Sequence, residues 1–249
     1  DAKNPVVIYE YQETRKAEHP KNFLNGYAGY LHTDGYAGYH ALPQEITVVG
    51  CLAHARRKFD EALNVITPND RASSSKAMKG KRFCDALFAI EDKLEKVAPD
   101  ERTKKRREVA APILLAFRGW LNSIHPAPKS AMGRAVAYTP EQWPWLTNYL
   151  KDGRLEISNN RAERSIKPFV MGRKNFLFAN TPGGATTGAI IYSLTLTAKE
   201  SGLEPYRYLT WLMTTAPALD LADAAQVEAL TPEIVTDLCR TRGGGDGYV

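Results

Sequence analysis

Apolar residues in the first fifty positions come in short runs, each bounded by residues that favour a turn. Runs rich in β-branched and aromatic residues, separated by Gly, Pro and Asp, are typical of short strands. Between the first two runs, His19-Pro20 opens a short helical stretch that Asn25-Gly26 closes. We therefore predict three strands, the first of them buried, and a longer helix that starts near Ala53. The strands are placed at residues 6–9, 29–33 and 46–49.

The next hundred positions follow a helical period. Residues 55–150 are predicted to be almost wholly helical, because apolar residues recur three or four positions apart and so share one helix face. A proline and an aspartate at residues 99–100 interrupt this pattern, which then resumes. The clearest face consists of Phe83, Leu87, Ile90, Leu94 and Val97.

Two kinds of signal place the later helices. Residues 139–142, Thr-Pro-Glu-Gln, match a capping box with proline at the first helical position, so a helix is predicted to begin there and to end at Asp152-Gly153. The glycine-rich sequence from Arg240 onward is predicted to be disordered. Strands with interspersed helices indicate an α/β core, into which the long helical block is inserted. Further helices are predicted at residues 185–200 and 205–215.

Composition places the chain among ordinary soluble globular proteins, with 249 residues, 43% hydrophobic and 24% charged. No run approaches the roughly 18 consecutive apolar residues of a membrane helix, and the first residues lack the pattern of a secretory signal. An odd number of widely spaced cysteines argues against a disulfide framework and favours a reducing cytosol. These cysteines are Cys51, Cys84 and Cys239.

Positive charge is concentrated in one segment. The chain has a formal net charge of +5 and a pI near 9.0, which is compatible with a polyanionic partner. Six Lys and Arg residues between residues 154 and 174 suit phosphate contacts, which give sequence-independent and salt-sensitive affinity. A solvated basic face is the ordinary alternative. The six are Arg154, Arg161, Arg164, Lys167, Arg173 and Lys174.

Asp34 stands where the second predicted strand ends and a glycine turn begins, in the sequence LHTDGY. A carboxylate at the C-terminal end of a sheet strand faces the crevice where α/β proteins usually bind ligands. Alternatively, an aspartate before glycine is a turn residue that hydrogen-bonds its own backbone. Taken alone, the residue is compatible with both roles, and the turn is the commoner one.

Glu163 is an isolated acid in the basic segment, in the sequence SNNRAERSIKP. On a helix it shares a face with Asn159 and Ile166, because these residues are four and three positions away from it. A structural interpretation is a reciprocal capping pair between Asn160 at the helix start and Glu163. That pair would explain the asparagine and the acid, but not the density of cations around them.

Cys51 and His54 form a C-x-x-H pair where the third predicted strand meets the following helix. A structural zinc site needs four ligands, typically from two such pairs, and the sequence has no second pair. A packed cysteine beside a hydrogen-bonded histidine is the favoured interpretation, while metal binding by the pair stays open. The sequence also lacks a G-x-S-x-G elbow and a G-x-x-x-x-G-K-[ST] loop, so it gives no support for a serine hydrolase or a P-loop ATPase.

Taken in order, five segments resemble the C-terminal part of the catalytic region of an insertion-sequence-66 family transposase. Five motifs in one order, over about residues 6–212, are far more specific than any single motif. The segments are LHTDGYAGY (31–39), GCLAHARRKF (50–59), SNNRAER (158–164), GRKNFLF (172–178), and IYSL with AK (191–194 and 198–199).

That family is similar to the RNase H-like DDE transposases, in which three carboxylates converge on divalent metal. The resemblance implies that Asp34 is the second acid and Glu163 the third, both of them catalytic residues and metal ligands. Two Mg²⁺ or Mn²⁺ ions are implied for the complete enzyme. The Cys51 and His54 pair resembles one found between the second and third acids of related transposases, where it is not one of the three acids.

The fold class expected from the resemblance is α/β: an RNase H-like mixed sheet with helices, lacking its first strands and interrupted by a mostly helical insertion. The first acid belongs upstream of the segment that matches residues 6–11, so the chain is expected to lack the first two strands and the first catalytic aspartate. The expected domains are a partial core at 1–54, the helical insertion at 55–152, the rest of the core at 153–215 and a C-terminal extension at 216–249, largely flexible at its end.

DNA transposition is the activity that the resemblance implies: water attacks to free a 3′-hydroxyl, which then attacks target DNA without a covalent enzyme intermediate. The partners would be double-stranded DNA at the transposon ends and target, bound by a homo-oligomer in the bacterial cytoplasm, with no membrane. The isolated chain is expected to be inactive without the first acid. The alternative is a non-catalytic DNA-binding remnant; a purely structural helical protein would leave the acids and cations unexplained. Phosphate contacts are expected from Arg56, Arg57, Arg161, Arg164, Lys167, Arg173 and Lys174.

Overall fold

The computed structural model describes residues 5–66, 75–176, 179–232, 234–235 and 239–240. The chain divides into two compact units. One unit is Arg15–Glu163, and the other combines Asp1–Thr14 with Arg164–Val249; we call the second the terminal unit. Within the described ranges, no helix is both long and apolar enough to cross a membrane.

The Arg15–Glu163 unit begins with α1 (Glu18–Phe23) and a small sheet of two strands, β1 (Gly29–His32) and β2 (Ile46–Val49). The strands are parallel and in register from Gly29 opposite Ile46 to His32 opposite Val49. Parallel strands need a crossover connection, and here it runs through a 3-10 turn, η1 (Ala37–Tyr39). The second and third predicted strands are therefore confirmed, in a mixed α/β fold that is mostly helical.

The first predicted strand, at residues 6–9, is wrong. In the terminal unit this segment is extended, but the backbone N–H groups of Val7 and Tyr9 donate to the hydroxyls of Thr197 and Ser193 on α8 (Pro182–Glu200). Val6 and Ile8 are exposed rather than buried. The apolar pattern of residues 6–9 resembles that of a strand. However, the backbone of these residues is hydrogen-bonded to side-chain hydroxyls of α8 and not to a neighbouring strand.

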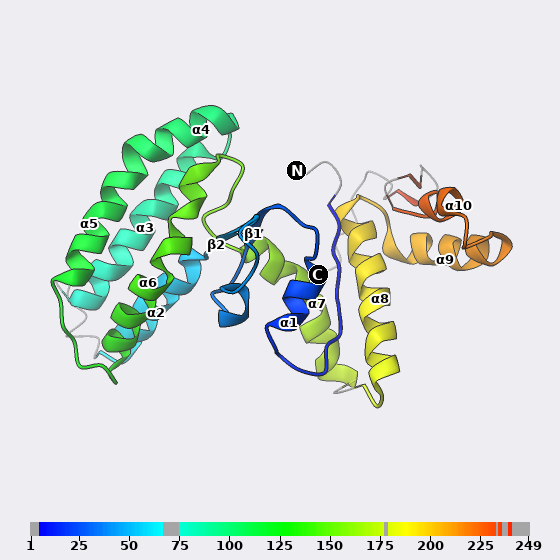
Figure 1. Cartoon of the computed structure of the whole chain (residues 1–249), viewed down its shortest axis with the longest axis horizontal. Helices are drawn as coiled ribbons and strands as arrows, with labels where there is room; N and C mark the ends of the chain where they lie inside the picture. The colour runs from blue at the N-terminus through cyan, green and yellow to red at the C-terminus, as the bar shows by residue number, and fades with distance from the viewer. Residues whose placement is uncertain (1–4, 67–74, 177–178, 233, 236–238, 241–249) are drawn as a thin grey trace. The chain divides into compact units, whose positions relative to one another are not determined.

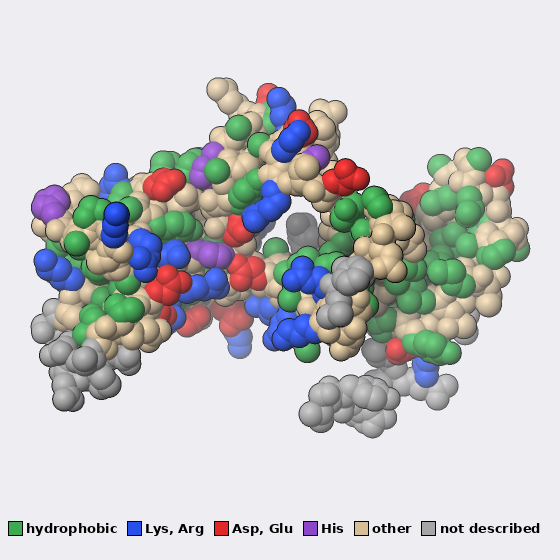
Figure 2. All heavy atoms as spheres, turned by 90° about the horizontal axis from the view of Figure 1, so that it is seen from below, with side chains coloured by type: hydrophobic (Ala, Val, Ile, Leu, Met, Phe, Trp, Pro, Cys, Tyr) green, Lys and Arg blue, Asp and Glu red, His purple; other side chains and the backbone are tan. Residues whose placement is uncertain are grey.

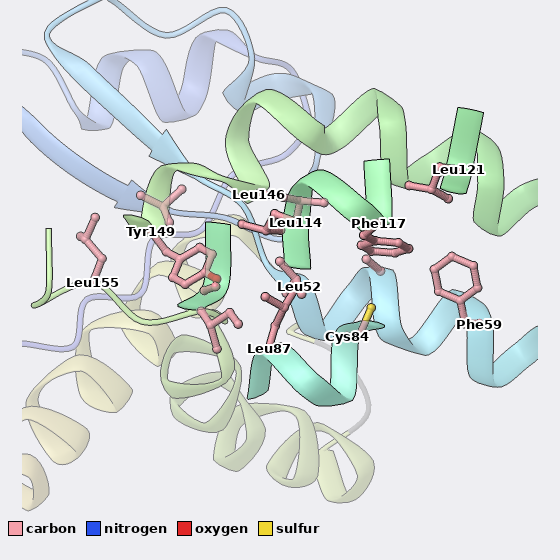
Figure 3. Close-up of a cluster of buried hydrophobic side chains, with 14 of the residues drawn as sticks. Leu52, Phe59, Cys84, Leu87, Leu114, Phe117, Leu121, Leu146, Tyr149 and Leu155 are labelled. Atoms are coloured by element: carbon pink, nitrogen blue, oxygen red, sulfur yellow. The ribbon is translucent and has the colours of Figure 1, made fainter. Parts of the chain in front are cut away.

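The helical block predicted at residues 55–150 is confirmed for its described residues, and residues 67–74 lie outside them. Helices α2, α3, α5 and α6 lie side by side (Figure 1) and enclose one hydrophobic core, in which Leu52, Phe59, Leu87 and Phe117 are at most 1% exposed (Figure 3). The block consists of α2 (Leu52–Asn64), α3 (Lys76–Leu94), α4 (Pro99–Lys105), a π-helical turn η3 (Arg106–Ala110), α5 (Ala111–Asn122), α6 (Ala131–Leu146) and a 3-10 turn η4 (Asn148–Lys151).

The helix start predicted at residues 139–142 is wrong, because α6 has already begun at Ala131. Ser130 caps it by accepting a hydrogen bond from the Gly133 N–H at 2.9 Å, and Pro140 lies inside the helix. The residues before the proline belong to the packed face, with Ala135 fully buried. Tertiary packing therefore stabilises the turns of α6 before Pro140, although the local sequence is also typical of a helix start.

A buried ion pair holds the segment that leads into the next helix. Arg106 is 0% exposed and donates from Nε and Nη2 to the two carboxylate oxygens of Glu91 at 2.8 and 2.6 Å. The same guanidinium donates to the backbone carbonyls of Tyr149, Asp152 and Leu155. One side chain thus fixes the chain that connects the helical block to α7 (Asn160–Phe176).

The terminal unit is helical, and its surface is rich in apolar side chains over α8 and α9 (Figure 2). The helix predicted at 205–215 is confirmed, and the one predicted at 185–200 begins three residues earlier because Thr181 caps it through the Gly184 N–H. All three cysteines are buried free thiols. The predicted disordered tail lies, from residue 241 on, outside the described residues. The remaining elements are α9 (Pro205–Thr215), η5 (Ala216–Ala218) and α10 (Ala224–Glu228).

Candidate functional site

Asp34 follows the end of β1 and is exposed. Its Oδ1 accepts a hydrogen bond from the Tyr36 N–H at 3.0 Å, so the local turn interaction predicted as an alternative is present. Gly35 has a φ of +85°, and a Cβ there would lie 2.8 Å from Oε1 of Gln142 on α6. Glycine therefore lets the turn lie close against α6 and places Asp34 at the end of the small sheet.

The junction between β2 and α2 is tied to two other segments. The Gly50 N–H donates to the carbonyl of Trp145 at 2.9 Å, and the Leu52 N–H donates to the carbonyl of Ile157 at 3.0 Å. The second bond joins the start of α2 to the chain just before α7. As a result, the first turns of α2 and α7 are held near one another within the Arg15–Glu163 unit.

Helix α7 begins at Asn160, directly after the buried Asn159. The Glu163 N–H donates to the carbonyl of Asn159 at 3.1 Å, and Asn160 is already the first helical residue. The Glu163 side chain reaches His54 and Arg57 of α2. This leaves the Glu163 carboxylate available for contacts with a neighbouring element.

Glu163 contacts the imidazole of His54, and Asp34 acts on the same imidazole electrostatically. His54 Nε2 lies 3.3 Å from Glu163 Oε1, and Arg57 Nη2 lies 3.9 Å from Glu163 Oε2. Burial lowers the pKa of His54, while the nearby carboxylates of Glu163 and Asp34 act in the opposite direction. At neutral pH the imidazole of His54 is therefore neutral, and its 3.3 Å contact with Glu163 does not join two full charges. Two acids far apart in the sequence thus act on the same side chain.

Cys51 is a packed thiol. It is 2% exposed, and burial raises its pKa although the backbone N–H of Asn159 stabilises the thiolate. In the part of the chain that the structure describes, no group of three or more His, Cys, Asp and Glu side chains is arranged to hold a metal ion. The packed cysteine of the favoured interpretation is present, whereas His54 contacts Glu163 through Nε2 and its buried Nδ1 has no hydrogen-bond partner among the described residues.

The donor atoms near Asp34 and Glu163 fit a hard divalent cation. Besides the two carboxylates, Thr33 Oγ1 and Asn159 Oδ1 are buried and have no hydrogen-bond partner among the described residues. Mg²⁺ prefers oxygen ligands and keeps several waters, so it is bound by only one or two protein carboxylates with waters and phosphates. Sequence spacing indicated that Asn159 shares a helix face with Glu163, whereas no pattern singled out Thr33.

The predicted phosphate-binding cations have two different environments. Five exposed side chains project from α7, which has no buried residue, and Arg57 is 56% exposed. Arg56, in contrast, is ion-paired with Asp85 at 2.5 Å and with Asp60 at 3.2 Å, so a phosphate would have to compete with two carboxylates for it. The five on α7 are Arg161, Arg164, Lys167, Arg173 and Lys174.

Comparison with known proteins identifies the family. The model of the Transposase IS66 family matches residues 1–187. Three uncharacterized proteins of Sinorhizobium fredii (strain NBRC 101917 / NGR234) are similar: y4hP is 31% identical over 221 residues, y4jD 30% over 215 and y4qI 31% over 240. These matches cover 82%, 82% and 92% of the chain but only 40%, 41% and 43% of the relatives. No solved structure matches. The chain belongs to the IS66 transposase family.

Proposed function

We propose that this chain is part of a transposase that cuts and joins DNA with the help of divalent metal, and that Asp34 and Glu163 are two of its metal-binding acids. The observation that carries the proposal is the contact of the Glu163 carboxylate with His54, on which Asp34 also acts electrostatically, together with the buried oxygens of Thr33 and Asn159 that have no hydrogen-bond partner among the described residues. Family membership supplies the substrate class, because a transposase acts on DNA. The RNase H-like architecture and the third, upstream acid are parts of the same proposal.

The roles of the residues follow from their positions. Asp34 and Glu163 would hold Mg²⁺ or Mn²⁺, two ions in the complete enzyme, which when bound activate a water or 3′-hydroxyl and stabilise charge on the reacting phosphate oxygens. Arg161 and Arg164 flank Glu163 at the start of α7, where exposed guanidinium groups can bind phosphates of the DNA backbone. Lys167, Arg173 and Lys174 extend this exposed positive charge along the helix, and Arg57 adds one cation from α2.

The experiment that tests the acid role is Glu163→Gln in the full-length protein. It removes the charge and leaves the size of the side chain, so strand cleavage should fall by about 10³-fold or more, which is about 4 kcal/mol of transition-state stabilisation. DNA affinity should stay within about twofold, because the cations that contact phosphate are untouched. Glu95→Gln, which changes an exposed acid, is the matched control. Equal loss of cleavage and DNA binding would contradict the metal-ligand role.

A non-catalytic DNA-binding remnant is the competing function, and the exposed cations of α7 are compatible with both. If the protein is such a remnant, the full-length protein should bind DNA in a salt-sensitive way and should show no metal-dependent cleavage. In either case the Arg164→Gln, Lys167→Gln double variant should lower the slope of log affinity against log salt by about 2, roughly one per lost phosphate contact. Lys96→Gln, at an exposed cation outside α7, should leave the slope unchanged. Cleavage by the full-length protein alone separates the two functions.

A further inference from the structure

We propose that His54 is a positioning residue that holds the Glu163 carboxylate in the orientation required for metal binding. The inference rests on the proposed function, because it concerns the same carboxylate. It assigns a role to the histidine of the C-x-x-H pair, which is neither one of the acids nor part of a metal cluster among the described residues. The role is contact of the imidazole Nε2 with the carboxylate, not ligation of metal by the imidazole.

His54 is placed on a rigid element. It lies in the first turns of α2, whose inward residues Leu52, Ala55 and Phe59 are at most 1% exposed. The His54 side chain is itself only 20% exposed. Because the helix beneath it is fixed by the core of the unit, Nε2 is presented at a defined point.

Glu163 needs such a partner. Its side chain is 37% exposed and lies in the first turn of α7, which buries no residue of its own. A glutamate side chain loses rotamer freedom when it is held in one conformation, so an unrestrained carboxylate would not keep one orientation. His54 Nε2, at 3.3 Å from Oε1, restrains it, whereas Arg57 lies farther away at 3.9 Å and is 56% exposed.

The backbone reinforces this arrangement. The hydrogen bond from the Leu52 N–H to the Ile157 carbonyl fixes the start of α2 against the chain that enters α7. The adjoining segment is clamped by Arg106 through the Leu155 carbonyl. Donor and acceptor are therefore both held by the scaffold of one unit. Partners that orient metal-binding carboxylates and histidines in this way typically change metal affinity by 10–100-fold when they are removed.

The test is a titration of the chain with Mn²⁺, in which electron paramagnetic resonance measures free Mn²⁺. Glu163→Gln serves as the reference for loss of a ligand. His54→Leu removes the donor and should weaken Mn²⁺ binding by about 10-fold. His54→Gln retains an N–H donor of similar reach but has no imidazole, so it should bind Mn²⁺ within about threefold of the parent. His125→Leu, at an exposed histidine, should have no effect.

The outcomes separate this inference from the proposed function. If Glu163→Gln leaves Mn²⁺ affinity unchanged, the metal role of Glu163 is wrong. If Glu163→Gln weakens binding but His54→Leu does not, the positioning role is wrong and the proposed function stands. If His54→Gln is as weak as His54→Leu, the imidazole itself acts on the metal and the inference is overturned. Thermal unfolding verifies each variant, and His54→Asn, too short to reach Glu163, replaces His54→Leu if that variant fails to fold.

Discussion

Two glutamates of the Arg15–Glu163 unit, Glu91 and Glu163, differ in burial and in how closely their cationic partners approach. Glu91 is 6% exposed, and its carboxylate is bound by Arg106 and Arg102 at 2.6–2.8 Å. Glu163 is 37% exposed, and its contacts with His54 and Arg57 are longer, 3.3 and 3.9 Å. The first carboxylate is enclosed by charged hydrogen bonds, whereas the second is partly exposed and lies beside a neutral imidazole and, farther away, the Arg57 guanidinium.

The difference separates structural acids from acids that can bind a ligand. A buried carboxylate with charged donors on both oxygens has no capacity for another cation, and its partner Arg106 also fixes three backbone carbonyls. A partly exposed carboxylate with a neutral imidazole at 3.3 Å and a guanidinium at 3.9 Å keeps lone pairs for metal. Stability experiments on the two glutamates and their surroundings test this distinction directly.

The largest effect is expected from Arg106→Met. The substitution leaves the Glu91 charge buried and removes the donors to the carbonyls of Tyr149, Asp152 and Leu155. Breaking a buried pair in this way typically costs about 3–5 kcal/mol of the free energy of unfolding, to be measured by urea denaturation. Lys104→Met, which alters an exposed cation of the same basic run, should change it by less than about 0.5 kcal/mol. If Arg106→Met lowers the free energy of unfolding by less than about 1 kcal/mol, the contrast between a structural Glu91 and a ligand-binding Glu163 is wrong.

A smaller effect is expected from Gly153→Ala, which probes the segment that Arg106 clamps. A Cβ at residue 153 would lie 1.9 Å from the carbonyl oxygen of Pro99, so one backbone segment must move. Overpacking of this kind typically costs about 1–3 kcal/mol. The control is Gly119→Ala in α5, where a Cβ meets nothing within 4 Å and helix propensity predicts a gain of about 0.5–1 kcal/mol. If Gly153→Ala is stabilised as Gly119→Ala is, the segment around Gly153 is less tightly packed than its contacts with Arg106 imply.

Local patterns predicted much of this unit but not its clamp. Strands β1 and β2 and the start of α2 were predictable, because short β-branched runs and turn residues determine them locally. Arg106, by contrast, lies in the run Lys-Lys-Arg-Arg, which is typical of a solvated surface, and its burial depends on carbonyls more than forty residues away. Asp34 and Glu163 were identified as site residues through family motifs. Taken alone, each acid also had an ordinary structural interpretation, Asp34 in a turn and Glu163 in a helix cap.

Errors in the sequence analysis have the same physical origin. Residues 6–9 have a strand pattern, but their backbone binds hydroxyls of α8, whose position no local pattern encodes. Pro140 has the context of a helix start, yet the preceding turns of α6 are held in the core. The contact between His54 and Glu163 was likewise unpredictable, because it depends on how α2 and α7 start beside one another. In each case the deciding contact joins segments distant in the sequence.

The smallest effect on stability is expected from Glu163→Gln in the chain studied alone. Exposed ion pairs contribute about 0–1 kcal/mol, and the closer partner, His54, is neutral, so the free energy of unfolding should change by less than about 1 kcal/mol. Glu91→Gln, the same chemical change, should cost about 3–5 kcal/mol, because it leaves Arg106 buried without its counter-charge. Urea denaturation of both variants at neutral pH makes the comparison. If Glu163→Gln is as destabilising as Glu91→Gln, Glu163 is a structural acid, and its carboxylate is no longer a candidate to hold metal beside a phosphate.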